Sequence, residues 1–179
     1  MTYFVISDTK FNDAATAKQL KMSLQDYNEM LISKWNSAVS DDDSVFIFGQ
    51  VAGGLLGKEI RPIIERLNGR VYIVNYFDNK YFNRDRWKSL GIHAIWDCNF
   101  TYPIDDDTIF FPAAKISIEK IDRKEYKYIC LREKDGAAEV YKDRCLSIEA
   151  KYWDYTPIRL REIPEIIKRM SVFEEMEEN

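Results

Sequence analysis

The feature that most constrains the fold is an alternation of short apolar segments with helix-like segments over the first hundred residues. The apolar segments have the length and the β-branched or aromatic content of buried strands, and they are "TYFVIS" (2–7), "SVFIF" (44–48), "RVYIV" (70–74) and "IHAIWD" (92–97). Strands that alternate with helices in this way are typical of parallel sheets covered by helices. The first half of the chain therefore predicts a largely parallel, layered α/β sheet.

The segments between these strands carry helix signals. Ser23, with Asp26 three residues later, predicts a capping box that starts a helix running to about Val39. The glycine-rich segment 49–57 leads into a second helix over 58–67, with Pro62 expected in its first turn. A third helix is expected over 81–90.

The second half is richer in strand-like segments. They are closely spaced, and they cover 108–112, 115–119, 125–131, 137–141 and 145–150, with a turn at 133–137. A final amphipathic helix carries apolar residues on one face, namely Ile163, Ile166, Ile167, Met170 and Phe173. We expect one domain over 1–172, followed by a frayed acidic tail over 173–179.

Bulk properties narrow the class of protein. The net charge of the 179 residues is −4, whereas proteins that bind nucleic acid usually carry an excess of positive charge. The charge therefore argues against a nucleic-acid partner. No apolar run approaches the length of a membrane span, and the N-terminus does not read as a signal peptide. Three cysteines without metal-type spacing are expected to be reduced thiols. We therefore expect a cytoplasmic protein with no membrane association.

The end of the first strand resembles the start of a metal site. The apolar run breaks at Ser7-Asp8, which places a carboxylate at the carboxyl edge of a strand. Lys10, however, stands where a second metal ligand would be useful, and a cation cannot ligate a cation. The chain has one histidine, His93, in a strand-like segment where we expect a structural role.

The segments taken together resemble the calcineurin-like metallophosphoesterases, in particular the small stand-alone members of bacteria and phages. "ISDTKF" (6–11) resembles the opening strand–D-x-H of that family without its His. "KWNSAVSDDDSVFIFGQVAGG" (34–54) resembles its W-N-x-x-V…L-G-D segment, with Phe48-Gly49-Gln50 in place of L-G-D. "RLNGRVYIVNYFDNK" (66–80) resembles the segment that ends in G-N-H-D, and 144–170 resembles the closing strand, turn and helix. The resemblance spans nearly the whole chain and implies an α/β fold, the αββα sandwich of two β-sheets flanked by helices.

The same resemblance implies a degenerate site. The family holds two metal ions with carboxylates, an amide and several imidazoles. By position, Asp8 survives, Lys10 replaces a His, and Gln50 replaces the bridging Asp. Tyr76 and Phe77 replace the Asn and the His, and Asp78 matches the family. A neutral Gln50 cannot supply a bridging charge, so we expect no metal, no cofactor and no catalytic residue.

These expectations lead to a pseudoenzyme: a catalytically inactive metallophosphoesterase-like protein that binds a protein partner, a copy of itself or a nucleotide-like ligand. Two alternatives stay open, a metal-dependent phosphoesterase with a reduced site at Asp8 and Asp78, and a structural subunit of an assembly. We expect the Lys10 ammonium to offset Asp8, directly or through water. Tyr76 and Phe77 either fill the space of lost ligands or form an exposed aromatic patch.

Overall fold

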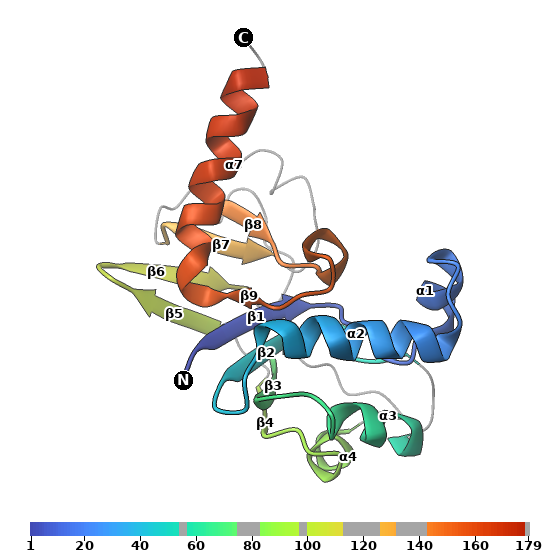
Figure 1. Ribbon diagram of the computed structural model, residues 1–179. Helices are drawn as coiled ribbons and strands as arrows, with labels where there is room; N and C mark the ends of the chain where they lie inside the picture. Colours follow the sequence, from blue (N-terminus) through green and yellow to red (C-terminus); the bar gives the residue numbers. More distant parts are fainter. Residues whose placement is uncertain (54–56, 75–82, 97–99, 113–125, 132–142, 178–179) are drawn as a thin grey trace.

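Two β-sheets form the body of the protein and helices flank them, as the computed structural model shows (Figure 1). The structure describes residues 1–53, 57–74, 83–96, 100–112, 126–131 and 143–177. Among these residues, no helix is both long and apolar enough to cross a membrane. The predicted α/β sandwich of two sheets with flanking helices is confirmed.

The first sheet has the strand order β4-β3-β2-β1-β9. Its strands are β1 (Tyr3–Ser7), β2 (Ser44–Phe48), β3 (Arg70–Val74), β4 (Ala94–Trp96) and β9 (Ile158–Arg159). The first four are mutually parallel, as the sequence predicted, and β9 runs antiparallel to β1. In register, Ser7 lies opposite Phe48, so β1 and β2 end at the same edge of the sheet.

The second sheet has the order β5-β6-β7-β8. Its strands are β5 (Phe100–Ile104), β6 (Asp107–Phe111), β7 (Tyr128–Leu131) and β8 (Cys145–Ser147). The β5–β6 pair is antiparallel, whereas β6, β7 and β8 are parallel to one another. Strand β5 was not predicted, because Pro103 and the exposed Thr101 interrupt its apolar pattern.

The helices and short 3₁₀ segments connect these strands. They are α1 (Ala14–Gln19), α2 (Leu24–Ala38), α3 (Gly57–Ile64), α4 (Arg84–Ser89), η1 (Ala150–Trp153), η2 (Leu160–Glu162) and α7 (Ile163–Glu177). The predicted cap of α2 is confirmed, since the Ser23 side chain accepts a hydrogen bond from the backbone N–H of Asp26 at 3.0 Å. Helix α1 was not predicted.

Successive residues of β2 point to opposite faces and thereby build two cores. Val45 and Ile47 pack on the helix side, in a core that includes Trp35 of α2. Phe46 and Phe48 pack toward the second sheet, where Phe48 stacks on Phe111 with ring centroids 5.0 Å apart. This explains why β2 reads as a continuous apolar run: both of its faces are buried.

The predicted position of Pro62, in the first turn of its helix, was wrong. Pro62 lies in the second turn of α3. Asp43, the last residue of the acidic segment 41–43, is 8% exposed and accepts hydrogen bonds from the backbone N–H groups of Thr2 and Ser40 at 2.6 and 3.0 Å. Helix α7 continues to Glu177, so residues 173–177 of the expected tail are helical.

Other predictions lie outside the described residues. They concern the strand-like segments 115–119 and 137–141 and the turn at 133–137.

Candidate functional site

Asp8 stands at the carboxyl end of β1 and joins it to the end of β2. Its backbone N–H donates to the carbonyl of Phe48 at 2.9 Å. Its carboxylate Oδ1 accepts from the backbone N–H of Gln50 at 2.8 Å, and its other oxygen, Oδ2, is buried. The carboxylate therefore caps the backbone of the residue that corresponds by resemblance to the bridging metal ligand.

Gly49 makes this contact geometrically feasible. Its φ of +73° lies in the left-handed region, which glycine enters without the steric cost of a Cβ. The chain turns at this residue immediately after β2, and the turn brings the next N–H, that of Gln50, to the Asp8 carboxylate.

The loop that follows β1 is unusual in backbone conformation. Asp8, Lys10 and Asn12 have φ values of +51°, +51° and +58°. Non-glycine residues with positive φ are uncommon, and they gather at functional sites, where the surrounding structure must hold them in place. Three of the five residues in 8–12 have positive φ, and no other five-residue stretch of the described chain has as many.

Backbone hydrogen bonds hold the loop against the segment after β2. The N–H of Lys10 donates to the carbonyl of Gln50 at 3.2 Å, and that of Phe11 donates to Val51 at 2.9 Å. The buried Thr9 hydroxyl donates to the same Val51 carbonyl at 2.8 Å. The two strand-end loops therefore form one unit, and Lys10 and Gln50 are positioned by their backbones.

The side chains of Lys10 and Gln50 are less constrained. Lys10 is half-buried and Gln50 is exposed. Among the ion pairs between described residues, none joins the Lys10 ammonium to Asp8. The direct form of the expected pairing is therefore not present, and pairing through water stays a prediction.

Asn12 ties the same loop to the helices. Its N–H donates to Asn28 Oδ1 of α2 at 2.8 Å, and its Nδ2 donates to Glu59 Oε2 of α3 at 3.2 Å. Beside it lies a hollow of about 400 Å³ between α2 and α3. Arg66 and Glu29 border this hollow with a two-fold ion pair at 2.6 and 2.7 Å. The pair lowers the pKa of Glu29 through its hydrogen bonds from Arg66.

Glu149 is a candidate site residue that the sequence reasoning missed. Ser7 bridges to Glu149 in parallel, and the Ser7 N–H donates to the Ile148 carbonyl at 2.8 Å. The ends of β1 and β8 therefore meet, with Asp8 and Glu149 each just beyond a strand end. The sequence did carry a signal for Glu149: a carboxylate stands at the end of the strand-like segment "CLSIEA" (145–150), as Asp8 does at the end of "TYFVIS" (2–7).

Glu149 is paired with a lysine two residues later. The Lys151 ammonium lies 2.8 Å from Glu149 Oε1, and the Glu149 side chain is 13% exposed. The hydrogen bond that Lys151 donates to Glu149 raises the pKa of Lys151. The Lys151 ammonium also lies 4.8 Å from the ring centroid of Tyr152, which is exposed.

The remaining predicted site residues lie elsewhere. Tyr76, Phe77 and Asp78 fall within 75–82, outside the described residues. His93 precedes β4 and contacts the ring of Tyr72 at 4.9 Å. Because β4 is parallel to β1, His93 stands at the amino ends of the strands, whereas Asp8 stands at the carboxyl ends.

The donor set near Asp8 does not fit a two-metal centre. Across the part of the chain that the structure describes, no group of three or more His, Cys, Asp or Glu side chains is placed to hold a metal ion. The strand-end group, defined as Asp8, Lys10, Gln50 and Glu149, comprises two carboxylates, one ammonium and one amide. Such a set can bind an ionic or hydrogen-bonding ligand, but it lacks the imidazoles and the bridging carboxylate of a two-metal site.

Comparisons with known proteins place the fold. No family model matches the chain. An uncharacterised protein of Methanocaldococcus jannaschii, MJ1445, is 30% identical over 112 residues, which are 57% of this chain and 63% of the relative. The chain therefore spans less than two thirds of the length of that relative.

Solved structures give a clearer match. AQ665, a protein of unknown function from Aquifex aeolicus, aligns with a TM-score of 0.65 at 18% identity, over 92% of this chain and 98% of that chain. This likeness shows a shared fold. A novel archaeal phosphodiesterase aligns with a TM-score of 0.38 at 14% identity, over 73% of this chain and 72% of that one. At that score the likeness carries no argument.

Proposed function

We propose that this protein is a non-catalytic binding protein built on a sandwich that resembles the calcineurin-like metallophosphoesterases. The observation that carries the proposal is the hydrogen bond from the Gln50 N–H to the Asp8 carboxylate at 2.8 Å. In a two-metal hydrolase a carboxylate at this strand end would direct its oxygens at a cation. Here one oxygen caps the backbone of the neighbouring loop, which is a structural use.

The residues around Asp8 support the same proposal. A bridging carboxylate is needed to keep two divalent cations about 3.5–4 Å apart, and the residue in that position by resemblance is the neutral Gln50. The only histidine of the sequence, His93, is at the amino end of β4.

The proposed ligand is nucleotide-like, with an anionic group directed at Lys10. In a two-metal hydrolase the metal ions neutralise phosphate oxygens. Lys10 is a cation at one of the positions where the resemblance expects a metal ligand. An ammonium can take over the attraction of the anion without the activation of water. The Glu149 carboxylate, whose side chain is 13% exposed, would accept hydrogen bonds from hydroxyl or amino groups of the same ligand.

Calorimetric titration with AMP and ADP tests this proposal. We expect binding by the wild-type protein and a loss of about tenfold in affinity for Lys10→Gln. Lys18→Gln, at an exposed lysine of α1, is the matched control and should bind as the wild type does. Absence of nucleotide binding would leave a protein partner as the occupant and would remove the nucleotide from the proposal.

Activity measurements test the non-catalytic part separately. Phosphomonoesters and phosphodiesters should not be hydrolysed above the buffer rate, with or without Mn²⁺. Added Mn²⁺ should leave the Tm unchanged, because only a ligand that binds the native state stabilises it. Metal-dependent turnover that Asp8→Asn abolishes would contradict the proposal and favour the reduced-site phosphoesterase.

A further inference from the structure

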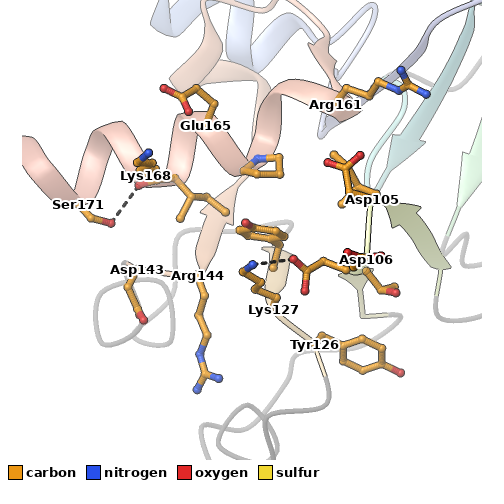
Figure 2. Close-up of a pocket in the computed structure, with 16 residues that line it drawn as sticks. Asp105, Asp106, Tyr126, Lys127, Asp143, Arg144, Arg161, Glu165, Lys168 and Ser171 are labelled. Carbon is orange, nitrogen blue, oxygen red and sulfur yellow. Dashed lines mark hydrogen bonds and ion pairs between the residues drawn. The ribbon is translucent and has the colours of Figure 1, made fainter.

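A second pocket lies at the opposite end of the second sheet from Asp8. It has a volume of about 860 Å³ and is bordered by the β5–β6 turn, the residues at the amino ends of β7 and β8, η2 and α7 (Figure 2). Strands β6, β7 and β8 are parallel, and the carboxyl end of β8 meets Ser7. The pocket at their amino ends is therefore separate from the strand-end group.

Two sides of this pocket carry opposite charges. Arg161 of η2 and Lys168 of α7 are exposed and form what we call the basic wall. Asp105 and Asp106, in the turn between β5 and β6, are exposed and form the acidic wall. Figure 2 draws the two aspartates on the side of the pocket opposite to Lys168.

Neighbouring charges are already balanced within the chain. Asp107 is paired with Lys127 at 2.6 Å, and this pairing raises the pKa of Lys127. Glu165, on the same helix as Lys168, is paired with Arg169 at 3.1 Å.

The two walls themselves are not joined. Among the ion pairs between described residues, none links Arg161 or Lys168 to Asp105 or Asp106. Arg161 and Lys168 thus border the same open pocket as Asp105 and Asp106 but come from different elements, and Asp143 and Arg144, just before β8, also border it.

A surface with adjacent basic and acidic strips is complementary to itself under a two-fold rotation. The rotation places the basic wall of each copy against the acidic wall of the other, so the same contact between a basic and an acidic wall occurs on both sides of the two-fold axis. Helix α7 projects from the body of the protein (Figure 1), and its Met170 is 48% exposed. The apolar part of a helix that projects beyond its own domain is available for burial by another chain.

We propose that a second copy of this chain docks on the pocket, with Arg161 and Lys168 of each copy facing Asp105 and Asp106 of the other. The charges favour this occupant over a nucleotide or another simple anion. Phosphate groups drawn to the basic wall would be repelled by the acidic wall, whereas a second copy satisfies both walls with the same residues.

Charge reversal of each wall, followed by mixing, tests the proposal. The basic-wall variant is Arg161→Glu/Lys168→Glu, and the acidic-wall variant is Asp105→Lys/Asp106→Lys. Each variant alone presents two walls of one sign to its own copy, so we expect its dimerisation to weaken by about tenfold or more. In the mixture both contacts become complementary again, so the two variants should form a one-to-one heterodimer.

Analytical ultracentrifugation of the wild type, the two variants and the mixture measures these outcomes. The wild-type dimer should also weaken as NaCl is raised from about 0.05 M to about 0.5 M, because exposed charges are screened. Lys18→Glu/Lys21→Glu reverses two exposed charges next to or within α1, far from the pocket in the chain, and should dimerise as the wild type does. Far-UV circular dichroism establishes that each variant is folded.

Three outcomes would overturn the proposal. One is a wild-type protein that stays monomeric at all concentrations. Another is a dimer that neither reversal weakens, which would place the contact on a different face. The third is a mixture of two folded, monomeric variants that does not associate, which would mean that the walls do not face each other. A combined variant with all four reversals again carries one basic and one acidic wall, so it should dimerise with itself.

Discussion

The Asp8 carboxylate and the Gln50 backbone N–H are joined by a hydrogen bond of 2.8 Å that links the ends of two parallel strands. Asp8 is itself in the left-handed region, with φ of +51°. The residue must therefore supply both an acceptor oxygen and a tolerance for positive φ. Aspartate and asparagine are the residues other than glycine that best combine these two properties.

Substitutions of Asp8 should separate the need for an acceptor oxygen from the need to tolerate positive φ. We expect Asp8→Ala to lower the free energy of unfolding by about 1.5–3 kcal/mol, the usual range for a hydrogen bond to a charged group. Asp8→Asn, which keeps an acceptor and tolerates positive φ, should cost less than about 1 kcal/mol. Urea unfolding measures both. Lys21→Ala, at an exposed residue with φ of +57°, is a control for backbone strain alone.

Gly49→Ala should weaken the hydrogen bond between the Gln50 N–H and the Asp8 carboxylate by changing the backbone next to the donor. A Cβ at φ of +73° costs about 1–2 kcal/mol and displaces the Gln50 N–H from Asp8. Because both substitutions break one hydrogen bond, the effects of Asp8→Ala and Gly49→Ala should not add in a double-mutant cycle. Full additivity would indicate that the glycine and the carboxylate act independently.

Lys10→Met should have a small effect on stability. No ion pair between described residues joins Lys10 to Asp8, so the cost should resemble that of an exposed charge, about 0–1 kcal/mol. The coupling between Lys10→Met and Asp8→Asn in urea unfolding should be below about 0.5 kcal/mol. A coupling above about 1.5 kcal/mol would instead support a water-mediated pair.

Asp43 should make the protein sensitive to acid. The backbone N–H groups of Ser40 and Thr2 stabilise its carboxylate and hold its pKa below the ordinary value of 3.8. A carboxylate with a lowered pKa in the folded state stabilises the fold above its unfolded pKa, and this contribution is lost as pH falls through the folded pKa. We therefore expect stability to decline below about pH 4.

Asp43→Asn should remove part of that decline, and chemical unfolding at a series of pH values measures the difference. The variant should also be less stable than the wild type at pH 7, by about 1–3 kcal/mol, since the hydrogen bonds are no longer made to a charge. Asp41→Asn, at an exposed residue of the same acidic segment, should leave the pH profile unchanged.

Local patterns in the sequence were sufficient for much of the first sheet. Strand β2 was predicted with its observed bounds, Ser44–Phe48, because five consecutive apolar or small residues leave no choice of which face to bury. Helix α2 was predicted because Ser23 and Asp26 make a cap whose hydrogen bonds are local. In both cases the determining interactions lie within a few residues along the chain.

What only the tertiary structure decided is where distant residues meet. Glu149 lies next to the end of β1 because it forms a β-bridge with Ser7, which is more than a hundred residues away in the sequence. Asp43 accepts a hydrogen bond from the backbone N–H of Thr2, which is also distant in the sequence. The two charged walls likewise come from the β5–β6 turn and from η2 and α7. A sequence pattern reports the preferences of neighbours along the chain, whereas these contacts depend on how the strands are ordered and registered, which is set by the packing of the whole core.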